Sequence, residues 1–353
     1  METVAALHFF FPETEVCSVT PLGRGNINET LRVILADGSS RVLQRLHPGV
    51  FPDPDAVMAN MRLVTAHLGR EQDESIRFCQ LGSNPEGKDQ FIDDEGCCWR
   101  ILSYIEKSRT LEQVENTAQA EAIGRLLGRF HCLTASLLPK HLADPLPGFH
   151  CTPLYLHQYD SLHQRGDSMN HLELQCAEMI EQMRPLAQLL EEGRDHLSQR
   201  VIHGDPKVAN FLFAESSDQA VSLIDLDTVK PGLLLHDIGD CLRSCCNPLG
   251  EGHEYPEETA FVPGLFAALM RGYIGQAGDL LASADRKLLV RAAAVISFEL
   301  GLRFFTDHLA GNRYFKVVRA GQNLHRARIQ FQLSQSVLGQ REELERCLHT
   351  LLP

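Results

Sequence analysis

The chain has 353 residues, of which 44% are hydrophobic and 22% are charged. This composition is typical of a folded globular protein and excludes a disordered chain, a collagen-like chain and a small disulfide scaffold. Lysine and arginine number 33 against 46 aspartates and glutamates, which gives a formal net charge of −13. That acidity argues against a general nucleic-acid-binding protein, but a phosphorylated small molecule needs only a few local cations.

The cellular setting is inferred from what the sequence lacks. The first residues show neither the basic segment nor the long apolar core of a signal peptide, and no apolar run is long enough for a membrane span. The 11 cysteines are an odd number, so they cannot all pair within the chain. We therefore expect a cytoplasmic protein with reduced thiols and with neither a membrane nor a nucleic-acid partner.

Cys241, Cys245 and Cys246 lack paired zinc-site spacing, and we expect them to be buried.

The first hundred residues are rich in predicted strands. Short β-compatible runs cover residues 16–20, 31–35 and 41–46, and Asp37-Gly38 between the last two is a strong hairpin signal. A helix is predicted to follow Asp53, which can cap it before Pro54, and to extend to about residue 68. Two more strands are expected, near Phe91 and over residues 98–105.

Helical patterns dominate from about Thr110 onward. One apolar face is formed by Ile123, Leu126, Leu127, Phe130 and Leu133. Another long helical stretch is predicted over 172–198, short strands over 200–202, 210–214 and 221–224, and helices from 263 to the end. The pattern predicts an α+β protein with two parts, a small β-rich part over residues 1–104 and a larger, mostly helical part over 105–353.

The most informative segment is VIHGDPKVAN at residues 201–210, followed by LIDLD at 223–227. A hairpin here would bring Asp205, Lys207, Asn210 and Asp225 together at one edge. A carboxylate can hold an attacking hydroxyl and remove its proton. Carboxylate and amide oxygens are ligands suited to Mg²⁺. A lysine can neutralise the charge on the phosphoryl group during its transfer. The segment therefore indicates phosphoryl transfer.

His203-Gly-Asp205 with Asn210 five residues later resembles the catalytic loop of the aminoglycoside phosphotransferase and choline kinase superfamily, and Ile224-Asp225 with Gly232 and Asp237 resembles its metal-binding segment. The resemblance implies the two-lobed protein-kinase-like fold, ATP and Mg²⁺. It implies that Asp205 is the catalytic base and that Asn210 and Asp225 bind metal. Lys207 matches a position where protein kinases place a lysine on the γ-phosphate.

A closer resemblance, spanning nearly the whole chain, is to sugar kinases of the N-acetylhexosamine 1-kinase type. It is carried by GRGNINET at 23–30, VLQRL at 42–46, VFPDPDAVMAN at 50–60, DLDTVKPG at 225–232, and RFFTD at 303–307 with YFK at 314–316. This family phosphorylates the anomeric hydroxyl of its sugar. The resemblance implies that Asp205, Arg303 and Tyr314 contact the sugar. Asn26 stands where the family usually has a histidine that helps to contact it.

The nucleotide contacts are expected on the N-terminal part. Gly23, Gly25 and Asn28 belong to the predicted phosphate-covering loop, although a plain hairpin turn also explains the two glycines. Related kinases carry a lysine on the third strand, where this chain has Gln44 and Arg45. Because an arginine can hold phosphate oxygens with two hydrogen bonds, Arg45 is the predicted phosphate contact, with a plain surface arginine as the alternative.

Adenine is expected against the segment 102–105, and we assign Ser103, Tyr104 and Ile105 to that contact.

Three residues in or near the His-Gly-Asp and Asp-Leu-Asp motifs are expected to have structural or metal-binding roles. We expect His203 to shape the loop and Asp237 to hydrogen-bond loop backbone. Asp227 is predicted as a metal ligand, with an ion-pair partner as the alternative.

Several other functions stay open at this point. The same catalytic loop would serve a kinase acting on an amino alcohol, a homoserine-like amine or an aminoglycoside. The missing third-strand lysine and Asn26 also permit a pseudokinase-like nucleotide-binding protein. A metal-dependent hydrolase is less favoured, because the 16 histidines form no HExxH-like ligand motif. The sequence does not indicate an oligomeric state.

Overall fold

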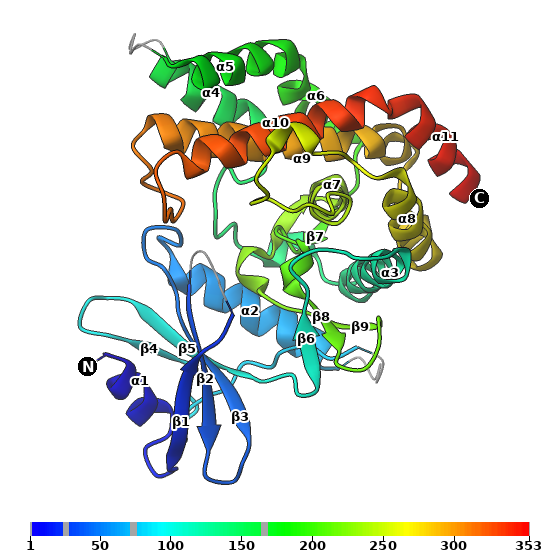
Figure 1. The fold of residues 1–353 in the computed structure, drawn as a ribbon. Coiled ribbons are helices and arrows are strands. Elements are labelled where there is room, and N and C mark those ends of the chain that lie inside the picture. The colour runs from blue at the N-terminus through cyan, green and yellow to red at the C-terminus, as the bar shows by residue number, and fades with distance from the viewer. Residues whose placement is uncertain (1, 24–27, 71–75, 164–168, 353) are drawn as a thin grey trace.

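A five-stranded antiparallel sheet forms the N-terminal part of the molecule, in the order β1-β2-β3-β5-β4 (Figure 1). The computed structural model describes residues 2–23, 28–70, 76–163 and 169–352. The strands of this sheet are β1 (Val16–Pro21), β2 (Glu29–Leu35), β3 (Ser40–Arg45), β4 (Gln90–Ile92) and β5 (Cys98–Ser103). The predicted hairpin at Asp37-Gly38 is confirmed, since β2 pairs with β3 and Gly38 has a φ of 80°.

The two faces of the sheet are covered by different helices. Helix α1 (Glu2–Phe10) packs Ala6 and Phe10 on the outer face, which also carries Leu43 and Trp99. Helix α2 (Pro54–Leu68) lies on the inner face, toward the rest of the molecule (Figure 1). As predicted, the Asp53 side chain caps α2 by accepting a hydrogen bond from the backbone N–H of Ala56. Residues of one strand alternate between these faces, so neighbours in sequence meet different surroundings.

Helices build most of the remaining chain, stacked above the sheet in Figure 1. They are α3 (Thr117–Thr134), α4 (Thr152–His163), α5 (His171–Met183), α6 (Leu189–Glu192), α7 (Leu234–Cys245), α8 (Pro263–Ala277), α9 (Ser283–Leu309), α10 (Gln322–Gly339) and α11 (Arg341–Leu351). The apolar face predicted for α3 is confirmed: its five residues are all buried, and α3 packs along α8. Cys241, Cys245 and Cys246 are fully buried in the same core, as expected.

Two small sheets sit beneath these helices and hold the motif residues. β7 (Gln199–Ile202) pairs with β10 (Lys230–Leu233), and β8 (Phe211–Ala214) pairs with both β9 (Ala220–Leu223) and β6 (Ser108–Thr110). Short 3₁₀ turns flank them, η4 (Val208–Asn210) before β8 and η5 (Leu226–Thr228) after β9. The β8–β9 hairpin is the one that the sequence predicts.

The structure also differs from the predicted elements. Helix α1 and strands β6 and β10 are additional, because such short segments are stabilised by pairing and packing rather than by their own periodicity. The helical stretch predicted over 172–198 is broken into α5, α6 and two 3₁₀ turns, since Pro185 lies two residues beyond the end of α5. The five-stranded sheet ends at Ser103; the division at residues 104 and 105 stays a prediction. Within the described ranges, no helix combines the length and apolar character of a membrane span.

Candidate active site

The loop between β7 and β8 brings the predicted catalytic groups together. The Nζ of Lys207 is in direct contact with Oδ2 of Asp205, and Nδ2 of Asn210 donates to the main-chain oxygen of Asp205 at 2.7 Å and to its Oδ2 at 3.3 Å. Burial alone would raise the pKa of Asp205, but the ammonium of Lys207 and its hydrogen bond hold that pKa below the ordinary value. Asp205 is thus a carboxylate, ready to accept a hydrogen bond or a proton.

Asp225 lies directly after β9 and beside this loop. The two segments are joined where the backbone N–H of Ile224 donates to the main-chain oxygen of Asn210 at 2.9 Å. Asp225 has a left-handed backbone (φ 67°, ψ 58°), which is uncommon for a residue with a side chain and is often found at functional sites. Burial and the neighbouring Asp227 carboxylate raise the pKa of Asp225 to about 7. A cation placed here would relieve the repulsion between these carboxylates.

Buried side chains from other elements hold the catalytic loop in shape. The carboxylate of Asp237, on α7, accepts hydrogen bonds from the backbone N–H of His203 at 2.6 Å and of Gly204 at 2.8 Å. The Asp237 carboxylate also lies 2.9 Å from Nε2 of His131 on α3. The ring of His203 reaches the main-chain oxygen of Ile224 at 2.9 Å, and burial lowers its pKa. These contacts match the structural roles that the sequence suggests for His203 and Asp237.

Gly204 is needed for the close approach of two segments. Its φ is 87°, and a Cβ atom on it would lie 2.6 Å from the main-chain oxygen of Thr228 in η5. Only glycine accommodates both this conformation and this contact without a backbone shift. The His-Gly-Asp motif therefore reflects the packing of the catalytic loop against the acidic segment.

Asn210 and Asp225 have the chemistry of a magnesium site. The amide nitrogen of Asn210 binds the Asp205 main chain, which leaves the amide oxygen as the atom able to ligate a cation. Among the described residues, no group of three or more His, Cys, Asp or Glu side chains is placed to hold a metal by itself. A site with one amide and one carboxylate suits Mg²⁺, which in proteins takes most of its other ligands from substrate phosphates and water.

Asp227 has other partners, although the sequence predicts a metal ligand. Its Oδ1 is in direct contact with Nη2 of Arg100, and its Oδ2 accepts a hydrogen bond from Nδ2 of Asn28 at 2.6 Å. Both carboxylate oxygens are thus occupied by side chains of the N-terminal sheet region. The structure supports the ion-pair role rather than the metal role for Asp227.

Arg45 is placed on the wrong face for the phosphate contact that the sequence predicts. Its Nη2 lies 2.6 Å from Glu95 and 3.4 Å from Glu2, and its Nε lies 3.3 Å from Asp93. Because neighbours in a strand point to opposite faces, Arg45 shares the outer face with Trp99, whereas Gln44 points inward. The acidic cluster with which Arg45 pairs includes Glu2 of the helix that the sequence did not predict.

The other residues predicted to contact the nucleotide lie after β1 and at the end of β5. Gly23 has a φ of 75° just after β1, as a tight turn requires, and Gly25 lies outside the described residues, as does Asn26. Ser103 ends β5, where its Oγ accepts a hydrogen bond from the backbone N–H of Gln80 at 2.8 Å. Tyr104 packs under the guanidinium of Arg32 at 4.4 Å, and Ile105 is buried. Their roles toward a nucleotide stay predictions.

Arg303 and Tyr314 meet in one aromatic cluster. The guanidinium of Arg303, on α9, lies 5.7 Å from the ring centre of Tyr314 and similarly close to Phe149 (5.0 Å), Tyr155 (5.2 Å) and Phe315 (5.4 Å). Burial opposes the charge of Arg303, yet these tyrosines and the carboxylates of Glu299 and Asp205 raise its pKa. The charge of Asp205 therefore acts on the guanidinium of Arg303.

Comparison with known proteins identifies the family. A family model described as a phosphotransferase enzyme family matches residues 18–279, well over half of the chain. The chain belongs to this phosphotransferase family. The closer relationship to N-acetylhexosamine kinases stays a prediction.

Solved structures share the fold of this phosphotransferase at low sequence identity. An aminoglycoside phosphotransferase from Alicyclobacillus acidocaldarius has a TM-score of 0.65 at 15% identity, with 97% of this chain and 96% of that chain covered. A microcompartment-associated aminopropanol kinase has a TM-score of 0.64 at 16% identity and 98% and 99% coverage. An amicoumacin kinase in complex with AMP-PNP and Ca²⁺ has a TM-score of 0.61 at 18% identity and 94% and 91% coverage. The fold is thus kinase-like, as the sequence predicts.

Three residues in contact with the predicted site or its supporting segments received no role from the sequence. Arg100 is fully buried, and its only sequence signal is a charge inside an otherwise apolar strand. Asp307 accepts hydrogen bonds from the backbone N–H groups of Arg313, Tyr314 and Phe315 at 2.8 to 2.9 Å and so anchors the segment that carries Tyr314. His150 lies against the catalytic loop, with Nε2 at 2.8 Å from the main-chain oxygen of Gly204.

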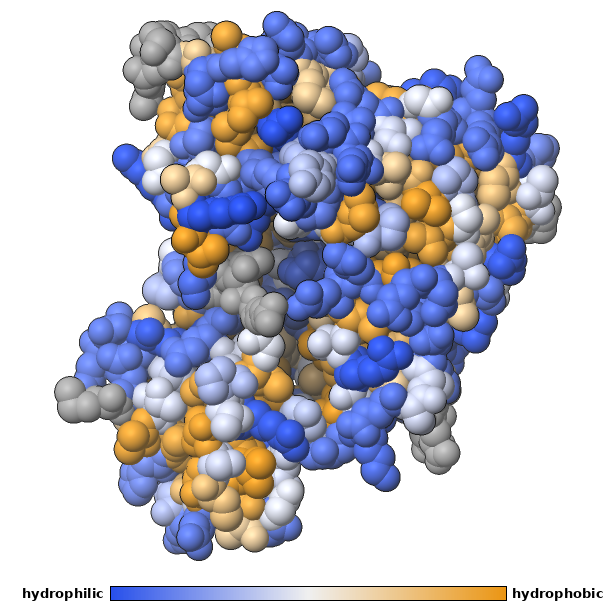
Figure 2. Space-filling model, viewed as in Figure 1, coloured by the Kyte–Doolittle hydropathy of each residue, from blue (hydrophilic) through white to orange (hydrophobic). Residues whose placement is uncertain are grey.

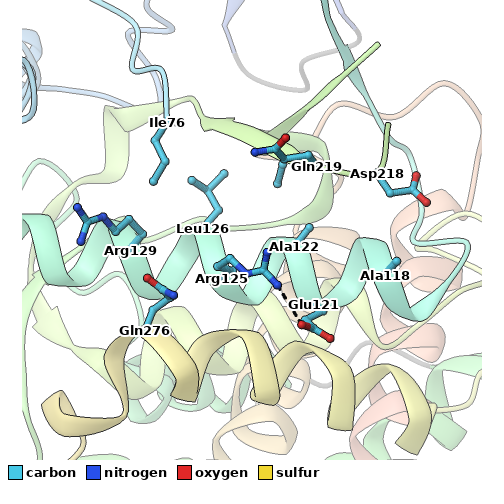
Figure 3. Close-up of a pocket in the computed structure, with 11 residues that line it drawn as sticks. Ile76, Ala118, Glu121, Ala122, Arg125, Leu126, Arg129, Asp218, Gln219 and Gln276 are labelled. Carbon is cyan, nitrogen blue, oxygen red and sulfur yellow. Dashed lines mark hydrogen bonds and ion pairs between the residues drawn. The ribbon is translucent and has the colours of Figure 1, made fainter. Parts of the chain in front are cut away.

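The surface of the phosphotransferase is hollowed between its two parts. Figure 2 shows a hollow between the N-terminal sheet and the helical part, on the face viewed. A separate cavity of about 680 Å³ lies between α3, α8 and the β8–β9 hairpin (Figure 3). Its charges are paired within the protein, for example Arg125 with Glu121 at 3.0 Å, and none of the predicted site residues lines it.

Proposed function

We propose that this phosphotransferase transfers the γ-phosphoryl group of ATP to a sugar hydroxyl, with the anomeric hydroxyl of an N-acetylhexosamine or a related sugar as the acceptor. The observation that carries the proposal is the direct contact of the Asp205 carboxylate with Lys207 and Asn210, and the charge of Asp205 also acts on the guanidinium of Arg303. The nucleotide is further supported by the amicoumacin kinase, which shares the fold and is complexed with AMP-PNP and Ca²⁺.

Asp205 is the base in this proposal. Its carboxylate holds the acceptor hydroxyl and takes its proton while the hydroxyl oxygen bonds to the γ-phosphorus and the bond to the ADP oxygen breaks. Lys207 balances the negative charge on the transferring group. Asn210 and Asp225 would hold Mg²⁺, which would supply charge neutralisation on the phosphates when bound.

The acceptor region favours a sugar over a cationic amine. Four aromatic rings surround the Arg303 guanidinium, and a stacked guanidinium keeps its in-plane N–H groups for oxygen acceptors. Such a cation attracts hydroxyl and carbonyl oxygens and repels an ammonium group. The rings also offer flat apolar surfaces to a sugar. The amino alcohol and aminoglycoside alternatives would place a positive charge beside Arg303.

The test is an acceptor screen that measures ADP release with Mg²⁺ and ATP. The panel contains N-acetylglucosamine, N-acetylgalactosamine, glucose, aminopropanol, choline and kanamycin, and phosphorus NMR locates the new phosphate. We expect turnover with N-acetylhexosamines and a phosphate on the anomeric oxygen. Turnover with cationic amines alone would overturn the sugar assignment, and nucleotide binding without ADP release from any acceptor would favour the pseudokinase alternative.

Two variants make the screen specific to this site. Asp205→Asn is expected to lower kcat by about 10²–10⁴ while the thermal unfolding temperature stays close to that of the wild type. Arg303→Gln is expected to raise the KM of the sugar while leaving the KM of ATP nearly unchanged. A folded Asp205→Asn protein with near-wild-type turnover would remove Asp205 from the role of base.

A further inference from the structure

The inner face of the N-terminal sheet carries one buried cation whose role the sequence left unassigned. Gln44 on β3 and Arg100 on β5 are directly opposed in the sheet register, so their side chains leave the same face. The Arg100 side chain is completely buried. It lies on the face turned toward α2 and the helical part, whereas Arg45 lies on the outer face.

Neighbouring side chains fix two of the three guanidinium nitrogens of Arg100. Nε and Nη2 donate to Oε1 of Gln44 at 3.1 Å and 2.7 Å. Nη2 also contacts Oδ1 of Asp227, which belongs to η5 in the helical part. Arg100 is therefore held in one orientation at the junction of the two parts, and its partner Asp227 lies two residues along the chain from the proposed metal ligand Asp225.

The third nitrogen, Nη1, is buried and has no hydrogen-bond acceptor in the part of the chain that the structure describes. A buried donor on a charged group without an acceptor costs more free energy than a neutral one, so it calls for an explanation, and a bound anion is one that fits its charge. Nη1 belongs to the same guanidinium as Nη2, which contacts Asp227 in the segment that also carries Asp225. Nη1 thus offers a hydrogen bond and positive charge close to the predicted metal and phosphate position.

We propose that Arg100 is the cation with which the N-terminal sheet binds the nucleotide phosphates, and that Gln44 and Asp227 fix its orientation. The proposal rests on the nucleotide site of the proposed function and assigns to a β5 arginine the contact that the sequence places on β3. A guanidinium held by two partners needs no further ordering when it meets a phosphate oxygen. Asp227 serves here as a positioning residue.

The test compares ligands with and without phosphates, using the full chain and no acceptor. Isothermal titration calorimetry gives the Kd of ATP with Mg²⁺ and of adenosine. We expect Arg100→Gln to weaken ATP binding by about tenfold or more, the effect of one charge-assisted contact, and to change adenosine binding by less than about twofold. Arg45→Gln, a matched change on the opposite face of the same sheet, is expected to leave both Kd values unchanged.

Loss of Arg100 leaves the Asp227 carboxylate buried without its cation, which can prevent folding. The double variant Arg100→Gln, Asp227→Asn removes both charges, and we expect it to fold and to show the same selective loss of ATP affinity. Arg100→Lys keeps the charge and is expected to recover part of that affinity. These variants keep the test informative when the single variant is unstable.

The outcomes separate this inference from the proposed function. Equal losses of ATP and adenosine affinity in the Arg100 variants, or a selective loss in Arg45→Gln instead, would overturn the role of Arg100. If the wild type binds ATP with the predicted dependence on Arg100 but phosphorylates no sugar, the acceptor proposal fails and the assignment of Arg100 stands. Failure of the wild type to bind ATP would overturn both.

Discussion

His150 joins the aromatic cluster to the catalytic loop at the scale of single residues. Its ring stacks on Phe149 at 4.0 Å, its Nδ1 lies 3.1 Å from Oε1 of Glu299, and its Nε2 lies 2.8 Å from the main-chain oxygen of Gly204. Because both partners are hydrogen-bond acceptors, this geometry favours a ring that carries a proton on each nitrogen, the imidazolium. Burial opposes this charge, but Glu299 and the Gly204 carbonyl raise the pKa of His150 above 6.5.

The first prediction concerns this titration. In an NMR pH titration, we expect the His150 ring to change its charge above pH 6.5, and we expect Glu299→Gln to lower that midpoint by removing the carboxylate. Because folding raises the pKa, the stabilisation from His150 is complete below the unfolded-state pKa of about 6.5 and declines as the pH rises through the folded-state value. A midpoint below 6.5 in the wild type would contradict the imidazolium assignment.

At the scale of elements, α3 and α8 pack unusually closely. A Cβ atom on Gly124 of α3 would lie 2.0 Å from the main-chain oxygen of Leu269, and one on Gly272 of α8 would lie 2.1 Å from that of Glu121. Glycines at both positions let the two backbones touch. This packing matters for the site because α3 also carries His131, which contacts Asp237 beneath the catalytic loop.

We therefore predict that Gly272→Ala destabilises the protein by about 1–3 kcal/mol, the usual cost of overpacking a close contact. Gly275→Ala is the control on the same helix, since its added methyl group would have no neighbour within 4 Å. It is expected to be neutral or stabilising by up to about 1 kcal/mol, because alanine favours helix over glycine. Urea unfolding of both variants measures the difference, and equal effects would show that the helices can separate at no cost.

At the scale of the whole molecule, Asn60 ties the N-terminal part to the helical part. From α2, its Nδ2 donates to the main-chain oxygens of Ala143 at 2.9 Å and Val229 at 2.8 Å, and its Oδ1 accepts from the N–H of Ala143 at 2.9 Å. The contacts of Asp227 with Arg100 and Asn28 form a second connection. Val229 and Asp227, where these connections reach the helical part, both lie within four residues of Asp225, so the site depends on how the two parts meet.

Asn60→Ala is predicted to lower overall stability by about 1–3 kcal/mol, because it leaves buried main-chain groups unpaired. The chain has a single tryptophan, Trp99 in the N-terminal sheet, whereas most helices lie in the other part. We expect fluorescence and circular dichroism to give one urea transition in the wild type, and the Trp99 signal to change first in the variant. The exposed Ala59→Ser serves as the control, and coincident transitions in Asn60→Ala would contradict the role of this connection.

Local chemistry made several features of this protein predictable from its sequence. The Asp-Gly hairpin, the capped helix after Asp53 and the apolar face of α3 each depend on a few neighbouring residues, and each was found where the pattern placed it. The gathering of Asp205, Lys207 and Asn210 also followed from sequence, because one short loop carries all three. Such features need no knowledge of distant parts of the chain.

The contacts between distant segments were decided only by the tertiary structure. Arg45 looked like the phosphate cation because a sequence lists the residues of a strand without the face to which each points. The unpredicted helix α1 adds Glu2 to the acids that pair with Arg45. Asp227 and Arg100 are 127 positions apart, and nothing local indicates that they pair. Burial and pairing between such distant residues decide which charged side chains are available to a ligand. These contacts form only when the two parts of the chain pack together, so no local stretch of sequence indicates them.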